Sequence, residues 1–133
     1  FEAAGREGFQ AVECDIHETA KDKKGKRRFV IMYDQAVVTC KYKQQLTYMR
    51  KYTRKMPLEY VRHDFTQNDL SWMKKYHINV SIDKNILSDD MIQLFETNNI
   101  KINIWTINNK DQLYNFTNKG IKIVTSDDTL WKE

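Results

Sequence analysis

Two carboxylates in a short apolar stretch near the amino terminus are the side chains most suggestive of chemistry. Glu13 and Asp15 lie at positions i and i+2 within AVECDIHET, residues 11–19. Side chains alternate along a strand, so this spacing directs both acids to the same face. Two neighbouring acids repel each other, and both lose hydration when they are buried. The pair therefore predicts a cation between the two side chains.

Strands that alternate with single helices are predicted over the last two thirds of the chain. The expected strands cover residues 11–16, 29–34, 36–42, 57–61, 79–83, 101–107 and 121–127. The expected helices cover residues 43–52, 66–76, 88–99 and 109–120, with Thr66, Ser88 and Asn109 as N-caps and Gly120 just past the last helix. Units of about 20 residues of this kind are typical of a parallel sheet with helices packed against it.

Polar side chains collect where the expected strands end. These residues are Asp15, Asp34, Asp83, Asn108 and Asp127. The carboxyl ends of parallel strands meet at one edge of the sheet, and this edge is where βα folds bind their ligands. An alternative for the last three is that they only cap helices, since Asp and Asn favour such positions.

The composition is that of one globular domain. The chain has 133 residues, 41% of them hydrophobic, with four Gly and one Pro. Cys14 and Cys40 are too few for a disulfide framework, so we expect buried free thiols, with a disulfide as the alternative. No apolar run reaches the roughly 18 residues that a membrane-spanning helix needs.

Much of the net charge of +4 lies in one basic run, KDKKGKRR, residues 21–28. We expect either a solvated loop or a contact with an anionic membrane surface. No nucleic-acid-binding motif accompanies the run, so no nucleic-acid partner is expected.

Five motifs in one order resemble a known family. They are VECDIHET, FVIMYD, VVTCKY, INIWTINNKDQL and GIKIVTSD, and they resemble the glycerophosphodiester phosphodiesterases. That family has a Glu-x-Asp strand and then a strand ending in His-Asp. A strand similar to Val-Trp-Thr-Val-Asn follows much later, and the last strand ends in Thr-Asp.

The resemblance implies a (β/α)8 barrel that hydrolyses glycerophosphodiesters to glycerol 3-phosphate and an alcohol, a step in lipid metabolism. It implies a divalent cation, Ca²⁺ or Mg²⁺, with Glu13 and Asp15 as ligands, and hard oxygen ligands suit such a cation. It also implies two histidines as general acid and base. Trp105 falls in the strand that lines the family's pocket, where it would contact the substrate, and the alternative is a Trp that fills the core.

The chain departs from the family at its catalytic histidines. The first strand, with its His-Arg-Gly motif, and the Glu-Asn-Thr motif after it are absent, and Tyr33 stands where the family has the His of His-Asp. A phenol with a pKa near 10 is a poor general base at neutral pH. His17 is a candidate substitute ligand or base, or else a loop residue, and His63 and His77 flank an expected helix as surface or capping residues.

The mapping leaves about six of the eight barrel strands, and the strand with the family's third carboxylate is missing. A closed barrel needs about 200 residues, so residues 1–133 are expected to form a single partial domain. Three explanations remain open: a fragment, a shortened form, or a barrel completed by another chain. Uncovered sheet edges would favour self-association.

The expected function is metal-dependent hydrolysis of a small-molecule glycerophosphodiester by a cytoplasmic or membrane-associated enzyme. The alternative is a catalytically inactive relative that retains weak metal or phosphate binding. A complete chain without both family histidines would have negligible activity.

Overall fold

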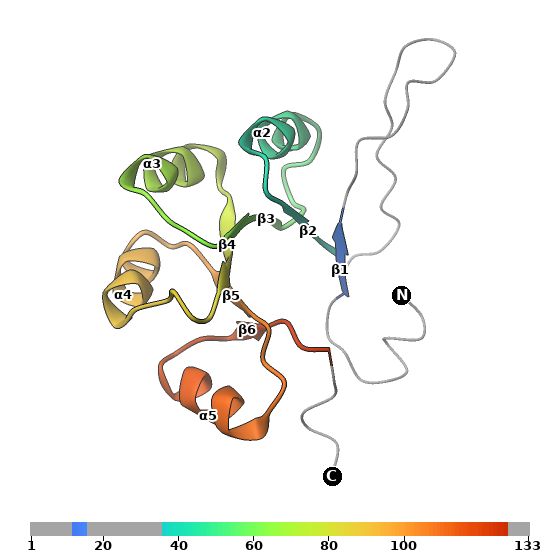
Figure 1. Ribbon diagram of the computed structural model, residues 1–133. Coiled ribbons are helices and arrows are strands. Elements are labelled where there is room, and N and C mark those ends of the chain that lie inside the picture. The colour runs from blue at the N-terminus through green and yellow to red at the C-terminus, as the bar shows by residue number, and fades with distance from the viewer. Residues whose placement is uncertain (1–11, 16–35, 128–133) are drawn as a thin grey trace.

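Six parallel strands form one sheet at the centre of the computed structural model, which describes residues 12–15 and 36–127, with side chains from residue 37 onward (Figure 1). The strands are β1 (Val12–Asp15), β2 (Ala36–Cys40), β3 (Leu58–Arg62), β4 (Asn79–Asp83), β5 (Ile102–Trp105) and β6 (Ile123–Val124). Each strand pairs with the next along the chain. The six strands agree with six predicted ones, and the predicted strand 29–34 lies outside the described residues.

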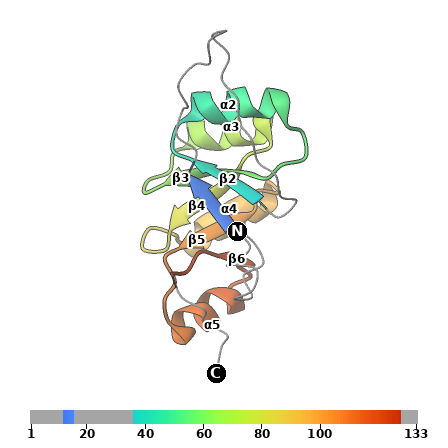
Figure 2. The ribbon, with the colours of Figure 1, turned by 90° about the vertical axis from the view of Figure 1, so that its right-hand side faces the viewer.

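Four helices connect strands β2 to β6. They are α2 (Lys43–Tyr52), α3 (Gln67–Tyr76), α4 (Asp89–Thr97) and α5 (Lys110–Asn118), each within the predicted limits. All four lie on the same outer side of the curved sheet (Figure 1), and Figure 2 views the molecule from the side away from α3 and α4. The prediction of a βα barrel is thus confirmed as far as an α/β half-barrel.

The outer face of the sheet forms the hydrophobic core together with the helices. Along β3, Leu58 and Tyr60 are buried on this face, and Phe95 of α4 is fully buried against it. The fully buried apolar side chains include Val38, Leu46, Leu58, Met73, Ile78, Val80, Ile82, Phe95, Ile104 and Ile107. Burying one such side chain contributes about 1.5–3 kcal/mol, so this one layer accounts for much of the stability.

Side-chain caps start the helices where the sequence predicts. Ser88 and Asn109 each accept a hydrogen bond from the amide three residues on, at 3.2 and 2.8 Å. At α3 the backbone amide of Thr66 donates to the carboxylate of Asp69 at 2.8 Å. Gly120 has φ +90, a conformation that favours glycine after a helix. The three predicted N-caps and the Gly stop signal are therefore confirmed.

An ion pair links α2 to the start of α3. Nζ of Lys43 lies 2.6 Å from Oδ1 of Asp69, whose side chain is 5% exposed. Burial would raise the pKa of the Asp69 carboxyl, but the hydrogen bonds from Lys43 and Thr66 and the Lys43 charge together hold the pKa below its usual value. The carboxylate therefore stabilises the fold in its ionised form.

The guanidinium of Arg50 links the carboxyl-terminal ends of α2 and α3. Arg50 donates from Nε to the carbonyl of Tyr76 at 2.9 Å and from Nη2 to that of His77 at 2.8 Å. Its Nη1 donates to the carbonyls of Thr53 and Met56 at 3.0 and 3.1 Å. Burial lowers the pKa of Arg50, but a guanidinium stays protonated in proteins. The side chain thus satisfies carbonyls that the helix ends leave unpaired.

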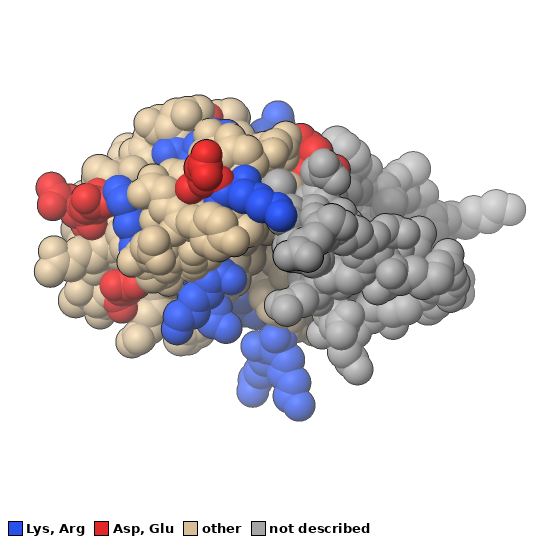
Figure 3. Space-filling view, turned by 90° about the horizontal axis from the view of Figure 1, so that it is seen from below, with Lys and Arg blue, Asp and Glu red and all other residues tan. Residues whose placement is uncertain are grey.

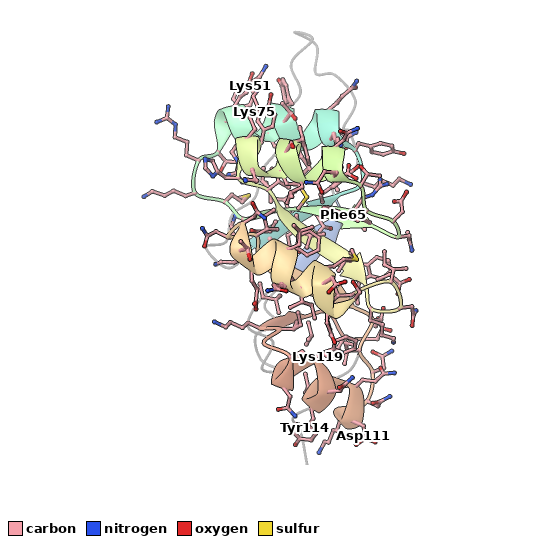
Figure 4. The ribbon with its side chains drawn as sticks, turned by 90° about the vertical axis from the view of Figure 1, so that its left-hand side faces the viewer. Lys51, Phe65, Lys75, Asp111, Tyr114 and Lys119 are labelled. Atoms are coloured by element: carbon pink, nitrogen blue, oxygen red, sulfur yellow. The ribbon has the colours of Figure 1, made fainter. Side chains whose placement is uncertain are left out.

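The outer surface carries both signs of charge. Lys51 and Lys75 project from α2 and α3 at one end of the helical layer, and Asp111 and Tyr114 lie on α5 at the other end (Figure 4). Between α5 and α4, Nζ of Lys119 lies 2.8 Å from Oδ1 of Asp89. Seen from below, acids and bases are interspersed over the described surface (Figure 3). Such a mixed surface is typical of a solvated helical layer.

The thiol of Cys40 is buried, as expected, and donates to Oε1 of Gln45 at 3.0 Å, whereas the side chain of Cys14 lies outside the described residues. Within residues 36–127, none of the helices has the length and apolar character needed to cross a membrane.

Truncating Phe95 should strongly destabilise the chain. Its side chain is fully buried, and its ring lies 4.8 Å from that of Phe65, centroid to centroid. We expect Phe95→Ala to lower the free energy of unfolding by about 3–5 kcal/mol in urea denaturation, because it leaves a cavity. Tyr114→Ala, at a side chain that is 62% exposed, is the control and should change it by less than about 0.5 kcal/mol. Equal effects of the two substitutions would contradict this core.

Removing the Asp69 charge should make the free energy of unfolding less dependent on pH in the acidic range. A group with a depressed folded pKa stabilises the fold above its unfolded pKa, and this contribution disappears as pH falls through the folded pKa. We expect Asp69→Asn to cost about 1–3 kcal/mol at pH 7, with the difference from wild type shrinking below about pH 4. The measurement is urea denaturation from pH 7 to pH 2. Asp64→Asn, at a 70% exposed side chain, is the control, and a pH-independent Asp69 effect would contradict the ion pair.

Candidate active site

The inner face of the sheet carries a row of buried polar side chains. Side chains alternate along each strand, so the residues between the core positions of β2 to β5 face away from the helices. Thr39, Glu59, Ser81 and Asn103 occupy this inner face, and each is at most 5% exposed. Closed βα barrels usually fill their interior with bulky branched side chains. A polar row in its place indicates a functional surface.

Hydrogen bonds link two members of this row to each other and one of them to the residue that follows β6. Nδ2 of Asn103 on β5 donates to Oε2 of Glu59 on β3 at 2.8 Å. Oγ1 of Thr125, which directly follows β6, donates to Oδ1 of Asn103 at 3.0 Å. On β4, between β3 and β5, the buried Oγ of Ser81 has no hydrogen-bond partner in the part of the chain that the structure describes. Because isolated buried charges are costly, the amide of Asn103 both stabilises and orients the Glu59 carboxylate.

A second cluster lies at the carboxyl ends of β3, β4 and β5. His63 follows β3 by one residue, Asp83 is the last residue of β4, and Trp105 is the last residue of β5. Nδ1 of His63 lies 3.5 Å from Oδ2 of Asp83. The imidazole also packs edge-to-face on Trp105, with 4.8 Å between ring centroids. Three consecutive strands thus bring an imidazole, a carboxylate and an indole together at the edge where βα folds bind ligands.

Asn108 and Asp127 form a third part of this edge. Nδ2 of Asn108 donates to Oδ2 of Asp127 at 2.9 Å, and the amide of Asp127 donates back to Oδ1 of Asn108 at 3.1 Å. The two residues follow β5 and β6, so their mutual bonds connect the ends of these strands. The result is a hydrogen-bonded polar rim at the same carboxyl edge as His63, Asp83 and Trp105.

The interpretation of Asp83 and Asn108 as helix caps is wrong, whereas the segment that Asp127 would cap lies outside the described residues. Helices α3, α4 and α5 begin at the N-caps Thr66, Ser88 and Asn109 instead. Asp83 accepts two bonds from Asn85, at 2.9 Å each, which close a turn rather than a helix. Asp83, Asn108 and Asp127 thus lie at or just after strand ends, as predicted, and ligand binding at this edge stays a prediction.

Most of the predicted metal and acid–base residues lie where side chains are not described. Glu13 and Asp15 belong to β1, whose backbone pairs them with Val37 and Thr39 of β2. His17, Tyr33 and the basic run 21–28 lie outside the described residues. Within residues 37–127, the structure brings no three His, Cys, Asp or Glu side chains into a metal-binding group. The predicted ligand pair therefore remains a prediction.

Trp105 lies at a strand end, as predicted, and is partly rather than fully buried. Its Nε1 is buried and has no hydrogen-bond partner among the described residues, although a buried indole usually finds a partner for its N–H group. The core-filling alternative for this ring stays a prediction. Its contact with a substrate remains a prediction.

His63 is the site residue that sequence reasoning missed. It was expected to be a surface or capping residue, and its side chain is indeed 75% exposed. The available signal was the period of two: Glu59, Val61 and His63 alternate with the core residues Leu58 and Tyr60. Continuing that alternation past the end of β3 directs His63 to the inner face.

No model of a known protein family matches this sequence, and no curated protein is detectably similar to it. A solved structure from Silicibacter pomeroyi DSS-3, a protein provisionally named as a glycerophosphoryl diester phosphodiesterase, is similar with a TM-score of 0.59 and 11% sequence identity. The similarity covers 70% of this chain and 34% of the other, so this chain spans about a third of that protein's length. At this identity the likeness concerns the fold alone, and it agrees with the half-barrel.

Replacing Glu59 should reveal how strongly the inner polar row depends on an acceptor at this position. Glu59→Gln retains a side-chain oxygen for the amide of Asn103, whereas Glu59→Ala leaves that buried amide unpaired. We expect Glu59→Ala to lower the free energy of unfolding by about 1–3 kcal/mol more than Glu59→Gln does. Urea denaturation measures both, with Glu96→Ala on the exposed side of α4 as the control. Equal losses for the Glu59 variants would contradict the described network.

Proposed function

We propose that this chain is part of a metal-dependent phosphodiester hydrolase that acts on glycerophosphodiesters. The observation that carries the proposal is the polar edge formed by consecutive strand ends of a βα half-barrel. His63, Asp83, Trp105, Asn108 and Asp127 all lie there. The similarity in fold to a structure named as a phosphodiesterase is consistent with it. The five sequence motifs that resemble the glycerophosphodiester phosphodiesterases are also consistent with the proposal.

The residues near β1 and β3 suit a hard cation. The donors are carboxylates: Glu13 and Asp15 by the resemblance, and Glu59 as a buried carboxylate on the inner face. Backbone register pairs Asp15 with Thr39, and Thr39 in turn with Glu59. Ca²⁺ and Mg²⁺ prefer oxygen donors of this kind. When bound, such a cation would neutralise phosphate charge and polarise the phosphorus for attack.

The remaining residues would hold the substrate. The partly buried ring of Trp105 offers an apolar surface for a glycerol or alcohol group. The amide and carboxylate of Asn108 and Asp127 provide a donor and acceptors for hydroxyl groups at the rim. Together they would orient the diester with its phosphate toward the inner face.

The test is release of glycerol 3-phosphate from glycerophosphocholine by the full-length protein with Ca²⁺ or Mg²⁺. We expect turnover that EDTA abolishes and that Glu13→Gln or Asp15→Asn lowers by about 100-fold or more, because even residues that only support metal ligands can matter by about 10–100-fold. Asp90→Asn on the exposed start of α4 is the matched control and should leave the rate unchanged.

Two other outcomes would decide against this proposal. Cation binding detected by calorimetry without any turnover would favour an inactive relative that retains metal binding. Turnover unaffected by EDTA and by both carboxylate substitutions would overturn the role of the metal.

A further inference from the structure

The three residues at the ends of β3, β4 and β5 form an arrangement that the resemblance does not supply. Nδ1 of His63 lies 3.5 Å from Oδ2 of Asp83. The His63 and Trp105 rings pack edge-to-face, with 4.8 Å between their centroids. The expected site residues His17 and Tyr33 lie before β2, whereas His63 comes from a different βα unit. The carboxyl edge of the sheet therefore carries an imidazole that is independent of His17 and Tyr33.

Asp83 is held so that it can orient this imidazole. Its Oδ1 accepts hydrogen bonds from the amide and the side chain of Asn85, each at 2.9 Å. These bonds leave Oδ2 directed at His63. The Asp83 side chain is 22% exposed, against 75% for His63, so the carboxylate forms the inner support and the imidazole the accessible tip.

The position of Asp83 opposite Nδ1 would favour one tautomer of neutral His63. An acceptor opposite Nδ1 favours the proton on that nitrogen. Nε2 then carries the lone pair, on a side chain that solvent and substrate reach. Catalytic contacts are often long without substrate and shorten when it binds, which is consistent with 3.5 Å between Nδ1 and Oδ2.

We propose that His63 is the general base of this site and that Asp83 is its positioning residue; this rests on the hydrolase function proposed above. Nε2 of His63 takes a proton from water as the water oxygen forms a bond to phosphorus. The bond from phosphorus to the leaving alcohol oxygen breaks, and that oxygen takes a proton from solvent. His63 then returns its proton to solvent, so the products are a phosphomonoester and an alcohol.

The other described histidine has none of these properties. His77 ends α3 with φ 51, before β4 begins, so it lies at the opposite edge of the sheet from His63. Its backbone carbonyl accepts from Arg50, which is a structural role. His77 is therefore a suitable control, because Asn tolerates its left-handed conformation.

The experiment compares His63→Asn, His77→Asn and wild type for hydrolysis of glycerophosphocholine by the full-length protein. General base catalysis contributes about 100- to 10,000-fold, so we expect His63→Asn to lower kcat by at least about 100-fold. His77→Asn should retain the wild-type rate. Imidazole added to His63→Ala should restore part of the activity, since the truncated side chain is an exposed one. Rescue of this kind would not follow from a purely structural role.

Nitrogen-15 NMR of the imidazole gives a readout that does not depend on turnover. We expect His63 in its neutral form to carry the proton on Nδ1, and Asp83→Asn to reduce the population of that tautomer. A proton on Nε2 in the wild-type chain would overturn the base assignment. Wild-type activity in His63→Asn would also overturn it while leaving the hydrolase proposal intact, whereas an inactive wild-type chain would remove the hydrolase function itself.

Discussion

The parallel register of the six strands is the constraint on which the rest of this structure depends. Each strand pairs with the next along the chain, and every described helix lies on the same side of the sheet. Side chains alternate along a strand, so this arrangement divides the residues of each strand into two classes. One class packs against helices, and the other faces the inner side. A slip of one residue would exchange the two classes.

The division separates stability from chemistry within single strands. On β3, Leu58 and Tyr60 contribute to the core, while Glu59 between them belongs to the buried polar row. On β5, Ile102 and Ile104 pack outward, while Asn103 donates to Glu59. The apolar layer and the helix caps stabilise the fold sufficiently to hold a carboxylate and several polar groups away from water. Buried polar groups without such support would be unfavourable.

At the carboxyl ends of the strands, residues that face the inner side come together as a candidate active site. His63, Asp83 and Trp105 come from positions about 20 residues apart, and the curvature of the sheet brings their side chains into contact. Asn108 and Asp127 join the next two strand ends. Because neighbouring strands supply adjacent groups, a βα sheet can assemble a catalytic cluster from residues that no local motif connects.

Much of the fold was predictable from the sequence alone, because its causes are local. Apolar periodicity and cap residues such as Ser88 and Asn109 act within a few residues, and they determined the helices and strands between residues 36 and 127. Only the tertiary structure decided which polar residues meet. The bond from Asn103 to Glu59 spans 44 residues, and the approach of His63 to Asp83 depends on strand register and sheet curvature. Neither strand register nor sheet curvature is encoded in a local sequence pattern. The sequence therefore predicted His63 only as a surface or capping residue, and the tertiary structure placed it at the centre of the candidate site.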